Sequence, residues 1–598
     1  MSIRTNPMKA IPLMLTRLRR IGSTMQLDKP CVEKLKMLTS QLEQIEDLFK
    51  IVKKNGNEFL DALSLLDGHL RKLHENKGDK DKLEPNILND ISKKIEEATK
   101  KLLPKGADNQ GQTQPSTTKK VKFMDQKIQK EPSDPSLSQL KNKLLAQDLN
   151  KAPKVSYKEL KDNLKPCVFS LNVFPEGAVI RKRHTVYWWI GEGFVKSEGE
   201  KTAEEVGEGV IDELLKFKVI FDYGNGSNPV AKKFVINPHI HYELKSLGPR
   251  EKHQLGSSLV LPSNVKQHDL HSQWLVLEKK KITLGSNKDN LKPEDLTTIF
   301  NLRVSYLNFV SQWSAKMRKL AVLQLGRWQD SPLQHIEVGS EEFLKELKDQ
   351  KHLKYLSLRG ISRIPELPPS IAQLSRLEIL DLKACHNLET LPTDIASMKS
   401  LTHLDVSECY LLDSMPRGIE KLTQLQVLKG FVIGNSRKTP CRITDLANLK
   451  KLKRLSIHIG SEAVIQPKEF ESLKELTAVK CLKISWGVFD KYSDIQVIFP
   501  PSLEKLDLEG FPGITIPEWL KPSRIPAAMK KLYIKGGKLK SLDHSEICHK
   551  WHVEILRLKY LNWLQLEERK LLKLFPSVKY VERTMVLNRS YPEWKFEE

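Results

Sequence analysis

Leucine recurs every 24 residues in the second half of this 598-residue chain, and no other feature constrains the fold as strongly. Four segments of the form L-x-x-L begin at Leu353, Leu377, Leu401 and Leu425. Apolar residues followed by proline repeat in step with them, at Leu367, Leu391 and Met415. Such a unit supplies one short strand and one irregular return, and it cannot bury its apolar face alone. Stacked neighbours bury it together, so the sequence predicts a curved leucine-rich repeat solenoid.

The pattern continues more loosely on both sides of these four segments. Further apolar triplets begin at Leu320, Leu452, Val479, Leu503, Met529 and Val553. A weaker match at Val578 and Val581 is expected to end the stack, where a capping unit with a polar outer face is needed. We therefore assign residues 296–598 to the leucine-rich repeat domain.

Two cysteines occupy equivalent places in adjacent repeats. Cys385 and Cys409 are 24 residues apart, in the slot where the leucine-rich pattern carries Asn or Cys. We expect each small side chain to turn inward and to bond to the backbone of a neighbouring repeat. A reactive or metal-binding thiol pair is the weaker alternative, because buried structural cysteines are inert.

The first 154 residues divide into three segments by composition. Residues 1–27 carry five basic side chains and no acidic one, which also fits a targeting segment. Apolar heptad positions in residues 28–103 predict helices that form a coiled coil or a small bundle. Whether that bundle is self-contained or mediates self-association stays open. Residues 104–154 are too polar to bury a core and are predicted to be a disordered basic linker.

The net charge of +24 raises nucleic acid or an anionic membrane as a binding partner. Much of the excess lies in the segments predicted to be unfolded, where solvated linkers are the favoured interpretation. A scaffold that binds nucleic acid or membrane through these segments is the alternative function. The seven cysteines form no C-x-x-C pair, and no apolar run is long enough to span a bilayer. We expect a cytoplasmic protein, with nuclear entry or peripheral plasma-membrane association as further options.

Residues 155–248 have the pattern of a winged helix. Three helices and two strands are expected around residues 158–171, 184–194, 203–215, 217–223 and 230–236. Thr202 and Glu205 form a capping box at the start of the third helix. A Gly- and Asn-rich turn separates the two strands, as in a hairpin wing. Residues 249–295 lack this pattern and are assigned to a connector.

The third helix is acidic, which bears on whether the winged helix binds DNA. It presents the carboxylates of Glu204, Glu205, Glu208, Asp212 and Glu213. Carboxylates that face phosphates oppose the counterion release that drives nucleic-acid binding. We therefore expect this helix to pack against protein.

Two stretches of the winged helix resemble a known family. Cys167 with Phe174-Pro175-Glu176, and then Trp189-Ile190-Gly191-Glu192-Gly193-Phe194, are similar to C-x-x-x-x-x-x-F-P-E and L-W-I-A-E-G-F of plant nucleotide-binding, leucine-rich repeat disease-resistance proteins. The N-terminal helices are placed as in the coiled-coil subclass of that family. The resemblance implies a multidomain α and α/β chain, with an N-terminal helical coiled coil or bundle, a winged helix and a C-terminal repeat solenoid.

The chain departs from this family where a nucleotide-binding module is expected, between the coil and the winged helix. No G-x-x-x-x-G-K-[ST] motif occurs, and a near match at residues 106–113 carries Gln112 in place of the lysine. Residues 237–241 lack the aspartate of the family's Met-His-Asp. Phosphoryl chemistry needs a backbone cradle, a lysine and a metal-binding carboxylate together. We therefore expect no nucleotide or other cofactor and no catalysis. His239 and His241, near an expected strand end, are interpreted as surface or packing residues rather than metal ligands.

The side chains between the inward leucines are expected on the concave face, because strand side chains alternate. Tyr355, Ile379, His403 and Val427 should form a ladder across adjacent strands. An amphipathic centre with a polar rim suits protein recognition, whereas an ordinary solvated surface is the alternative. The predicted partner-binding residues are Tyr355, Ser357, Arg359, Ile379, Asp381, Lys383, His403, Asp405, Ser407, Val427 and Lys429.

These patterns favour a non-catalytic plant defence protein that recognises other proteins through its repeats. The family resemblance implies an adaptor, a regulator or a decoy. Its partner would be a pathogen effector, a host kinase or a full-length resistance receptor.

Overall fold

The computed structural model of the chain describes residues 156–223, 232–247, 273–285, 292–329, 336–434, 440–460, 463–487, 495–546 and 549–584, with the backbone alone of 251–252, 256–260 and 595–596. These residues belong to one compact unit, Asp134–Glu598. The predicted segments 1–27, 28–103 and 104–154 lie outside the described residues, so their coiled coil and linker stay predictions.

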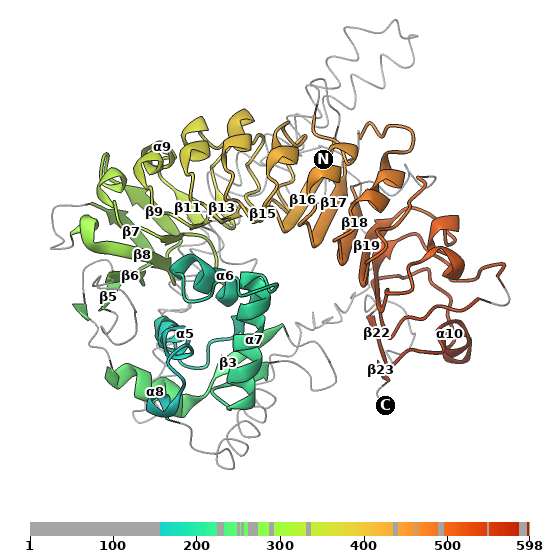
Figure 1. Ribbon diagram of the computed structural model, residues 1–598, viewed down its shortest axis with the longest axis horizontal. Helices are drawn as coiled ribbons and strands as arrows, with labels where there is room; N and C mark the ends of the chain where they lie inside the picture. Colours follow the sequence, from blue (N-terminus) through green and yellow to red (C-terminus); the bar gives the residue numbers. More distant parts are fainter. Residues whose placement is uncertain are drawn as a thin grey trace, which may run out of the picture. The chain divides into compact units, whose positions relative to one another are not determined.

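The winged helix is built around a small antiparallel sheet with the strand order β1-β3-β2 (Figure 1). Its elements are η1 (Tyr157–Glu159), α5 (Lys165–Ser170), η2 (Leu171–Val173), β1 (Ile180–Arg181), α6 (Lys182–Glu192), α7 (Ala203–Lys216), β2 (Ile220–Tyr223), β3 (Lys233–Ile236) and α8 (Pro238–Leu247). The capping box is confirmed, since the backbone N–H of Thr202 donates to Glu205 Oε2 over 2.9 Å and the N–H of Glu205 donates to Thr202 Oγ1 over 3.3 Å.

The second expected strand of this domain ends at Ile236, as predicted, but the helix that follows it was not predicted. Residues Pro238–Leu247 form helix α8. Asn237 starts it, because its side-chain oxygen accepts the N–H of His239 over 2.9 Å and Pro238 fits a first helical position. The interpretation of His241 as a packing residue is confirmed, since it is buried with Nε2 2.9 Å from the carbonyl oxygen of Phe174.

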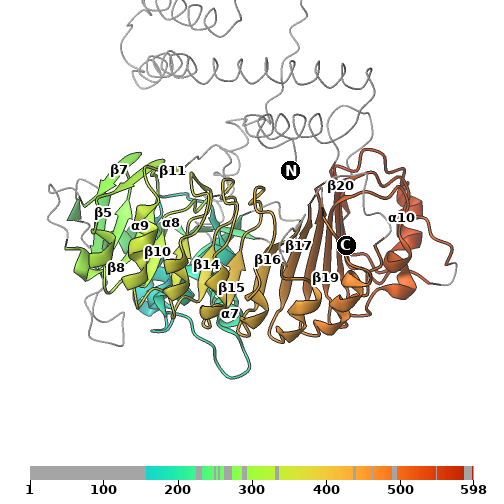
Figure 2. The ribbon, with the colours of Figure 1, turned by 90° about the horizontal axis from the view of Figure 1, so that it is seen from above.

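The repeats form one long sheet in which neighbouring strands from β6 to β22 are parallel (Figure 2). Leu356, Leu380, Leu404 and Leu428 are directly paired in register, as the 24-residue spacing predicts. The parallel strands are β6 (Gln273–Leu277), β8 (Leu296–Asn301), β10 (Val322–Gln324), β12 (Tyr355–Ser357), β14 (Ile379–Asp381), β15 (His403–Asp405), β16 (Val427–Ile433), β17 (Arg454–Ile459), β18 (Cys481–Trp486), β19 (Lys505–Phe511), β20 (Lys531–Gly537), β21 (Ile555–Lys559) and β22 (Tyr580–Thr584).

The connector assigned to residues 249–295 belongs in large part to the solenoid, which corrects the predicted boundary. Strand β6 pairs with β8, and antiparallel β5 (Gly256–Val260) and β4 (Glu251–Lys252) extend the sheet beyond it. Trp274 and Val276 face the winged-helix core, whereas Leu275 and Leu277 face the repeat core. A strand that is buried on both faces has apolar residues at successive positions. The alternation of apolar and polar residues that marks the other repeat strands is therefore absent from β6.

The returns between strands lie on the outer side of the array (Figure 1). The first repeats carry a second parallel sheet of β7 (Lys281–Leu284), β9 (Tyr306–Phe309), β11 (Ile336–Val338) and β13 (Ile361–Ser362), together with α9 (Glu342–Glu346). Short 3₁₀ helices follow the prolines of later repeats, including η7 (Pro369–Gln373) and η8 (Thr393–Ser397). Their isoleucines Ile371 and Ile395 are fully buried beneath the strands.

The two repeat cysteines are structural. Cys385 Sγ donates to the carbonyl oxygen of Leu358, and Cys409 Sγ donates to that of Leu382, both over 3.1 Å. Burial raises the pKa of Cys385 to about 12, so its thiol stays protonated and unreactive at neutral pH. The predicted bonding of these residues to neighbouring backbone is confirmed.

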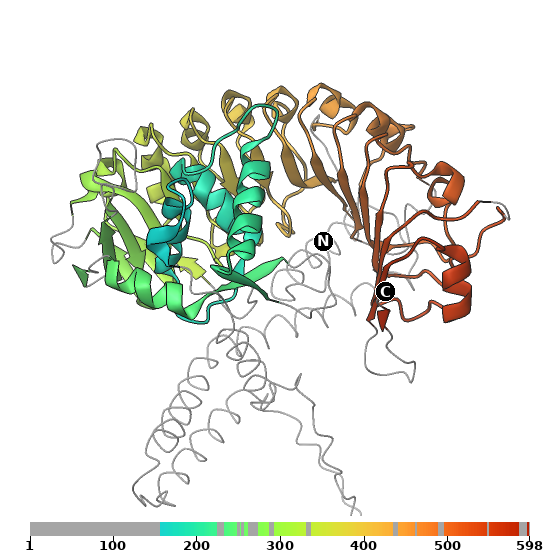
Figure 3. The same cartoon turned by 60° about the horizontal axis from the view of Figure 1, so that its bottom comes forward.

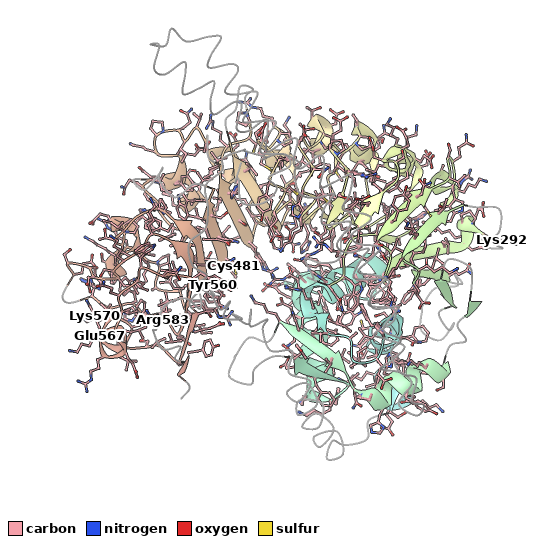
Figure 4. The ribbon with its side chains drawn as sticks, turned by 180° about the vertical axis from the view of Figure 1, so that it is seen from behind. Lys292, Cys481, Tyr560, Glu567, Lys570 and Arg583 are labelled. Carbon is pink, nitrogen blue, oxygen red and sulfur yellow. The ribbon has the colours of Figure 1, made fainter. Side chains whose placement is uncertain are left out.

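The array ends at β22, which contains Val581 as predicted; beyond it the described backbone shows only β23 (Lys595–Phe596), paired antiparallel. Arg583 on β22 is buried, and its guanidinium donates to the carbonyl oxygens of Leu564 and Leu566, each over 3.1 Å. Figure 4 labels Arg583 at this end of the molecule, near α10 (Glu568–Leu574). These side-chain to backbone bonds tie the last described parallel strand to the preceding return.

Leu380 lies at the centre of the repeat core and is 1% exposed. We expect Leu380→Ala to lower the free energy of unfolding by about 2–5 kcal/mol, because the removed methyl groups leave a cavity. Denaturant unfolding measures the loss. Gln373→Ala, on the exposed outer turn that precedes the strand of Leu380, is the matched control and should leave stability nearly unchanged. Equal stability of the two variants would contradict the inward placement of Leu380.

Candidate functional site

The winged helix lies against the concave, strand-bearing face of the first repeats (Figures 1 and 3). One apolar cluster contains residues of both domains. The ring of Phe174 lies 4.9 Å from that of Trp328, and the ring of Trp188 lies 4.9 Å from that of Phe300 and 5.5 Å from that of Trp274. Aromatic pairs at such distances contribute beyond the area they bury. The two domains therefore share a core.

Helix α6 approaches the strands so closely that one position has no room for a side chain. A Cβ atom on Gly191 would lie 2.6 Å from Cβ of Tyr355 and 3.0 Å from Cγ2 of Val322. The family pattern that this segment resembles carries alanine at the position of Gly191. The glycine is thus a departure that permits this close approach.

A buried carboxylate on α7 joins the two domains. Glu204 is 4% exposed, and its Oε2 lies 3.2 Å from Nε2 of His403. Its Oε1 lies 2.5 Å from Nη1 of Arg454 and 3.4 Å from Nε of Arg183. Burial alone would favour the neutral acid, but the hydrogen bond with His403 and the charge of Arg454 hold the pKa of Glu204 well below its usual value. The ring of Tyr187 covers His403 at 4.6 Å.

The other acidic side chains at the start of α7 also meet basic residues of the repeats. Glu205 Oε1 lies 2.6 Å from Lys453 Nζ, and Glu208 Oε1 lies 3.7 Å from Arg454 Nη2. These pairs are more exposed than Glu204 and stabilise the interface less. The expectation that this helix packs against protein is confirmed.

The structure brings the predicted partner-binding residues together on one face but does not leave that face open. Tyr355, Ser357, Arg359, Ile379, Asp381, His403, Asp405 and Val427 are buried, whereas Lys383, Ser407 and Lys429 are half-buried. Several touch the winged helix directly, as where Arg359 Nη1 lies 2.9 Å from His184 Nε2. The expectation of an exposed surface is wrong, because α6 and α7 occupy this part of the concave face. Partner binding by these residues stays a prediction.

Sequence reasoning missed the interface residues Trp274, Phe300, Trp328, Lys453 and Arg454. A signal was present in α6, whose residues from Thr185 to Gly191 are all buried. A helix that is apolar on every side is covered on every side, and a winged helix alone covers one face. The excess of Tyr187, Trp188 and Trp189 therefore indicated a second packing partner.

A small cavity remains at the junction of the two domains. It is lined by aromatic rings, among them Trp188 and Trp328, and by Arg181, Arg327 and Asp381. Among the described residues, no group of His, Cys, Asp and Glu is placed to hold a metal ion, and no helix is long and apolar enough to cross a membrane. The described site is a contact between two domains of one chain.

The fit at Gly191 can be tested against a second helical glycine. A Cβ atom on Gly209 of α7 would meet no atom within 4 Å. Alanine favours a helix over glycine by about 1 kcal/mol, so Gly209→Ala should stabilise the chain by about that amount. Gly191→Ala gains the same helix propensity but forces Tyr355 aside, and we expect a net loss of about 1–3 kcal/mol. Thermal unfolding of both variants decides this; stabilisation by Gly191→Ala would contradict the tight contact.

The carboxylate of Glu204 should make a large contribution to stability. Glu204→Gln leaves the half-buried Arg454 without its buried counter-ion and removes the acceptor of His403, so we expect the free energy of unfolding to fall by about 1–3 kcal/mol at pH 7. Glu213→Gln on the same helix removes a partly exposed pair with Lys161 and should cost less than about 1 kcal/mol. Denaturant unfolding measures both, and equal losses would show that Glu204 is not the central contact.

Acidification should weaken this interface. Burial, against the opposing hydrogen bond with Glu204, lowers the pKa of His403, so the unfolded chain binds more protons below pH about 6.5. The lowered pKa of Glu204 adds a second loss below pH about 4.5, where the unfolded carboxylate takes up a proton first. We expect the free energy of unfolding to fall as the pH drops below about 6.5 and again below about 4.5. In the lower range the difference in stability between the unaltered chain and Glu204→Gln should become smaller. Unfolding at pH 8 to 4 measures this; a constant deficit would contradict the assignment.

Two family models match the regions whose geometry is described above. A model described as disease resistance protein winged helix domain matches residues 173–242. A model described as leucine-rich repeat region matches residues 305–570. Both agree with the domains built from α5–α8 and from the parallel strands.

Similar proteins include plant disease resistance proteins. Disease resistance RPP13-like protein 4 of Arabidopsis thaliana is 28% identical over 71% of this chain and 49% of its own length. Disease resistance protein PIK6-NP of Oryza sativa subsp. japonica is 28% identical over 37% of this chain and 20% of its own length. This chain thus spans half or less of these two relatives. A leucine-rich repeat protein of Leptospira interrogans aligns with 48% of this chain and 78% of its own, with 20% identity and a TM-score of 0.30. The chain therefore joins a disease-resistance-type winged helix to a leucine-rich repeat region, and its relatives are plant disease resistance proteins.

Proposed function

We propose that the chain is a non-catalytic component of plant defence that recognises other proteins through its repeats. It would act as an adaptor, regulator or decoy for complete resistance receptors rather than as a nucleotide-driven switch. The observation that carries this proposal is the shared core of the winged helix and the repeats, held by Glu204, His403 and Arg454. This rigid body presents the later strands of the solenoid, from β17 onward, as a recognition surface.

The absence of a nucleotide switch is part of the proposal. It is supported by the sequence between the predicted coil and the winged helix, which carries Gln112 where a phosphate-binding loop needs lysine. We expect the purified full chain to release no ADP or ATP when it is denatured and chromatographed. A nucleotide-binding protein prepared in the same way is the positive control. Stoichiometric ADP from well-folded chain would overturn the proposal.

The recognition role is tested by affinity purification of the tagged full chain from plant leaf tissue. We expect resistance receptors or defence kinases to be enriched and to stay bound after nuclease treatment and in about 0.5 M salt, where exposed charge interactions are screened within a few ångströms. Gly191→Ala should change the set of captured proteins, whereas Gly209→Ala should not. Capture that is lost with nuclease would instead favour a scaffold that binds nucleic acid. Capture that survives nuclease and is lost only in high salt would indicate an exposed electrostatic contact with a protein partner.

A further inference from the structure

The concave face continues beyond the winged helix, over strands β18 to β22. We call its outward residues the C-terminal concave face. Burial alternates along β18 and β19, and the in-register pairing of β20 and β21 with them extends the assignment. Six basic side chains lie on this face: Lys483, Lys505, Lys531, Lys535, Arg557 and Lys559. Three acidic side chains share it, namely Asp507, Glu509 and Glu582. Six cations against three carboxylates leave this face with a positive excess.

The carboxylates of this face are shared between cations. Glu509 lies 2.5 Å from Lys483 Nζ and 2.6 Å from Lys535 Nζ. Glu582 lies 3.1 Å from Arg557 Nε and 2.6 Å from Lys559 Nζ. Each of these carboxylates carries one negative charge and neighbours two cations. The positive charge around it is therefore only partly neutralised, and the cations can also attract an incoming anion. The side chains of Lys535 and Lys559 are 48% and 34% exposed, so an incoming group can reach them.

Tyr533 fixes the cations at the centre of the face. Lys505 Nζ lies 4.2 Å from the centroid of its ring, and Arg557 Cζ lies 4.7 Å from the same centroid. Such cation–π contacts restrict otherwise flexible side chains, and groups already held in place lose less entropy when they bind.

A seventh cation, Lys232 of the winged helix, lies close enough to this face for its charge to interact with Lys505 and Arg557. Desolvation and the charges of Lys505 and Arg557 lower the pKa of Lys232 to about 8. These like charges repel one another, and a bound anion would relieve that repulsion.

We propose that the C-terminal concave face binds an extended acidic segment of a partner protein. This assignment rests on the proposed protein-recognition function and adds the chemistry of the ligand. Positive potential on a concave surface attracts and orients acidic partners. The chain's own residues 1–27 do not complement this face, because they carry five basic side chains and no acidic one.

A nucleic acid fits the face less well than an acidic polypeptide. Its phosphates are regularly spaced and uniformly negative. They would meet the carboxylates of Asp507, Glu509 and Glu582 along with the cations. A polypeptide can place a neutral or basic residue opposite each carboxylate, so mixed charge favours a protein ligand.

The test uses fluorescein-labelled ten-residue peptides and the full chain. The acidic probe alternates glutamate with serine, the basic probe alternates lysine with serine, and a ten-nucleotide single-stranded DNA is the third probe. The double variant Lys535→Ala/Lys559→Ala removes two exposed cations, yet Glu509 keeps Lys483 and Glu582 keeps Arg557. The fold should therefore survive. Lys570→Ala/Lys573→Ala, on exposed α10, removes the same charge elsewhere; Figure 4 labels Lys570 there and Cys481 on β18.

We expect fluorescence anisotropy to show binding of the acidic probe, weakened about tenfold or more by Lys535→Ala/Lys559→Ala and less than about twofold by the α10 control. The basic probe should not bind. Equal weakening by both double variants, or no acidic-peptide binding, would overturn the assignment. A loss confined to the DNA probe would assign the face to nucleic acid instead. If the peptide fails while salt-resistant capture from leaf tissue persists, the proposed function stands and only the ligand chemistry falls.

Discussion

The contact between the winged helix and the repeats depends on one buried carboxylate. Glu204, at the start of α7, pairs with His403, Arg454 and Arg183. The aromatic residues of α6 pack against the neighbouring strands. A charge in such a place is tolerated only when its partners are fixed, because desolvation opposes ionisation. The docked arrangement is therefore specific, since a shifted helix would bury the charge without its counter-ions.

The two halves of the concave face differ in chemistry for a physical reason. Around Tyr355 and Ile379 the face is apolar and covered by α6, so it behaves as the interior of a domain. From β18 onward it carries ion pairs and cation–π contacts, and its charged side chains stay partly exposed. The uniform repeat scaffold thus supports a permanent internal contact at one end and a surface suited to reversible association at the other.

The solenoid could be predicted from the sequence because its information is local and periodic. Each inward leucine reports the same environment 24 residues later, and Cys385 and Cys409 repeat that register. The docking of two domains has no period, so nothing in Tyr355 or His403 alone distinguishes a covered residue from an exposed one. The same limit explains β6, whose two buried faces hide the alternation that marks the other strands. The acidic side chains of α7 and the surplus of aromatic residues in α6 pointed to a second contact, but neither identified its residues in the repeats.

The missing side chain at Gly191 restricts which winged helices and repeat domains can be combined. A hybrid that joined these repeats to a winged helix with alanine at that position would hold α6 away from Val322 and Tyr355. Exchange of domains between related chains would then require glycine in place of Tyr355 on β12, because the atom that a new side chain would meet first is the Cβ of Tyr355. The winged helix and the repeats are separate domains in the sequence, but their contacting surfaces fit one another in shape.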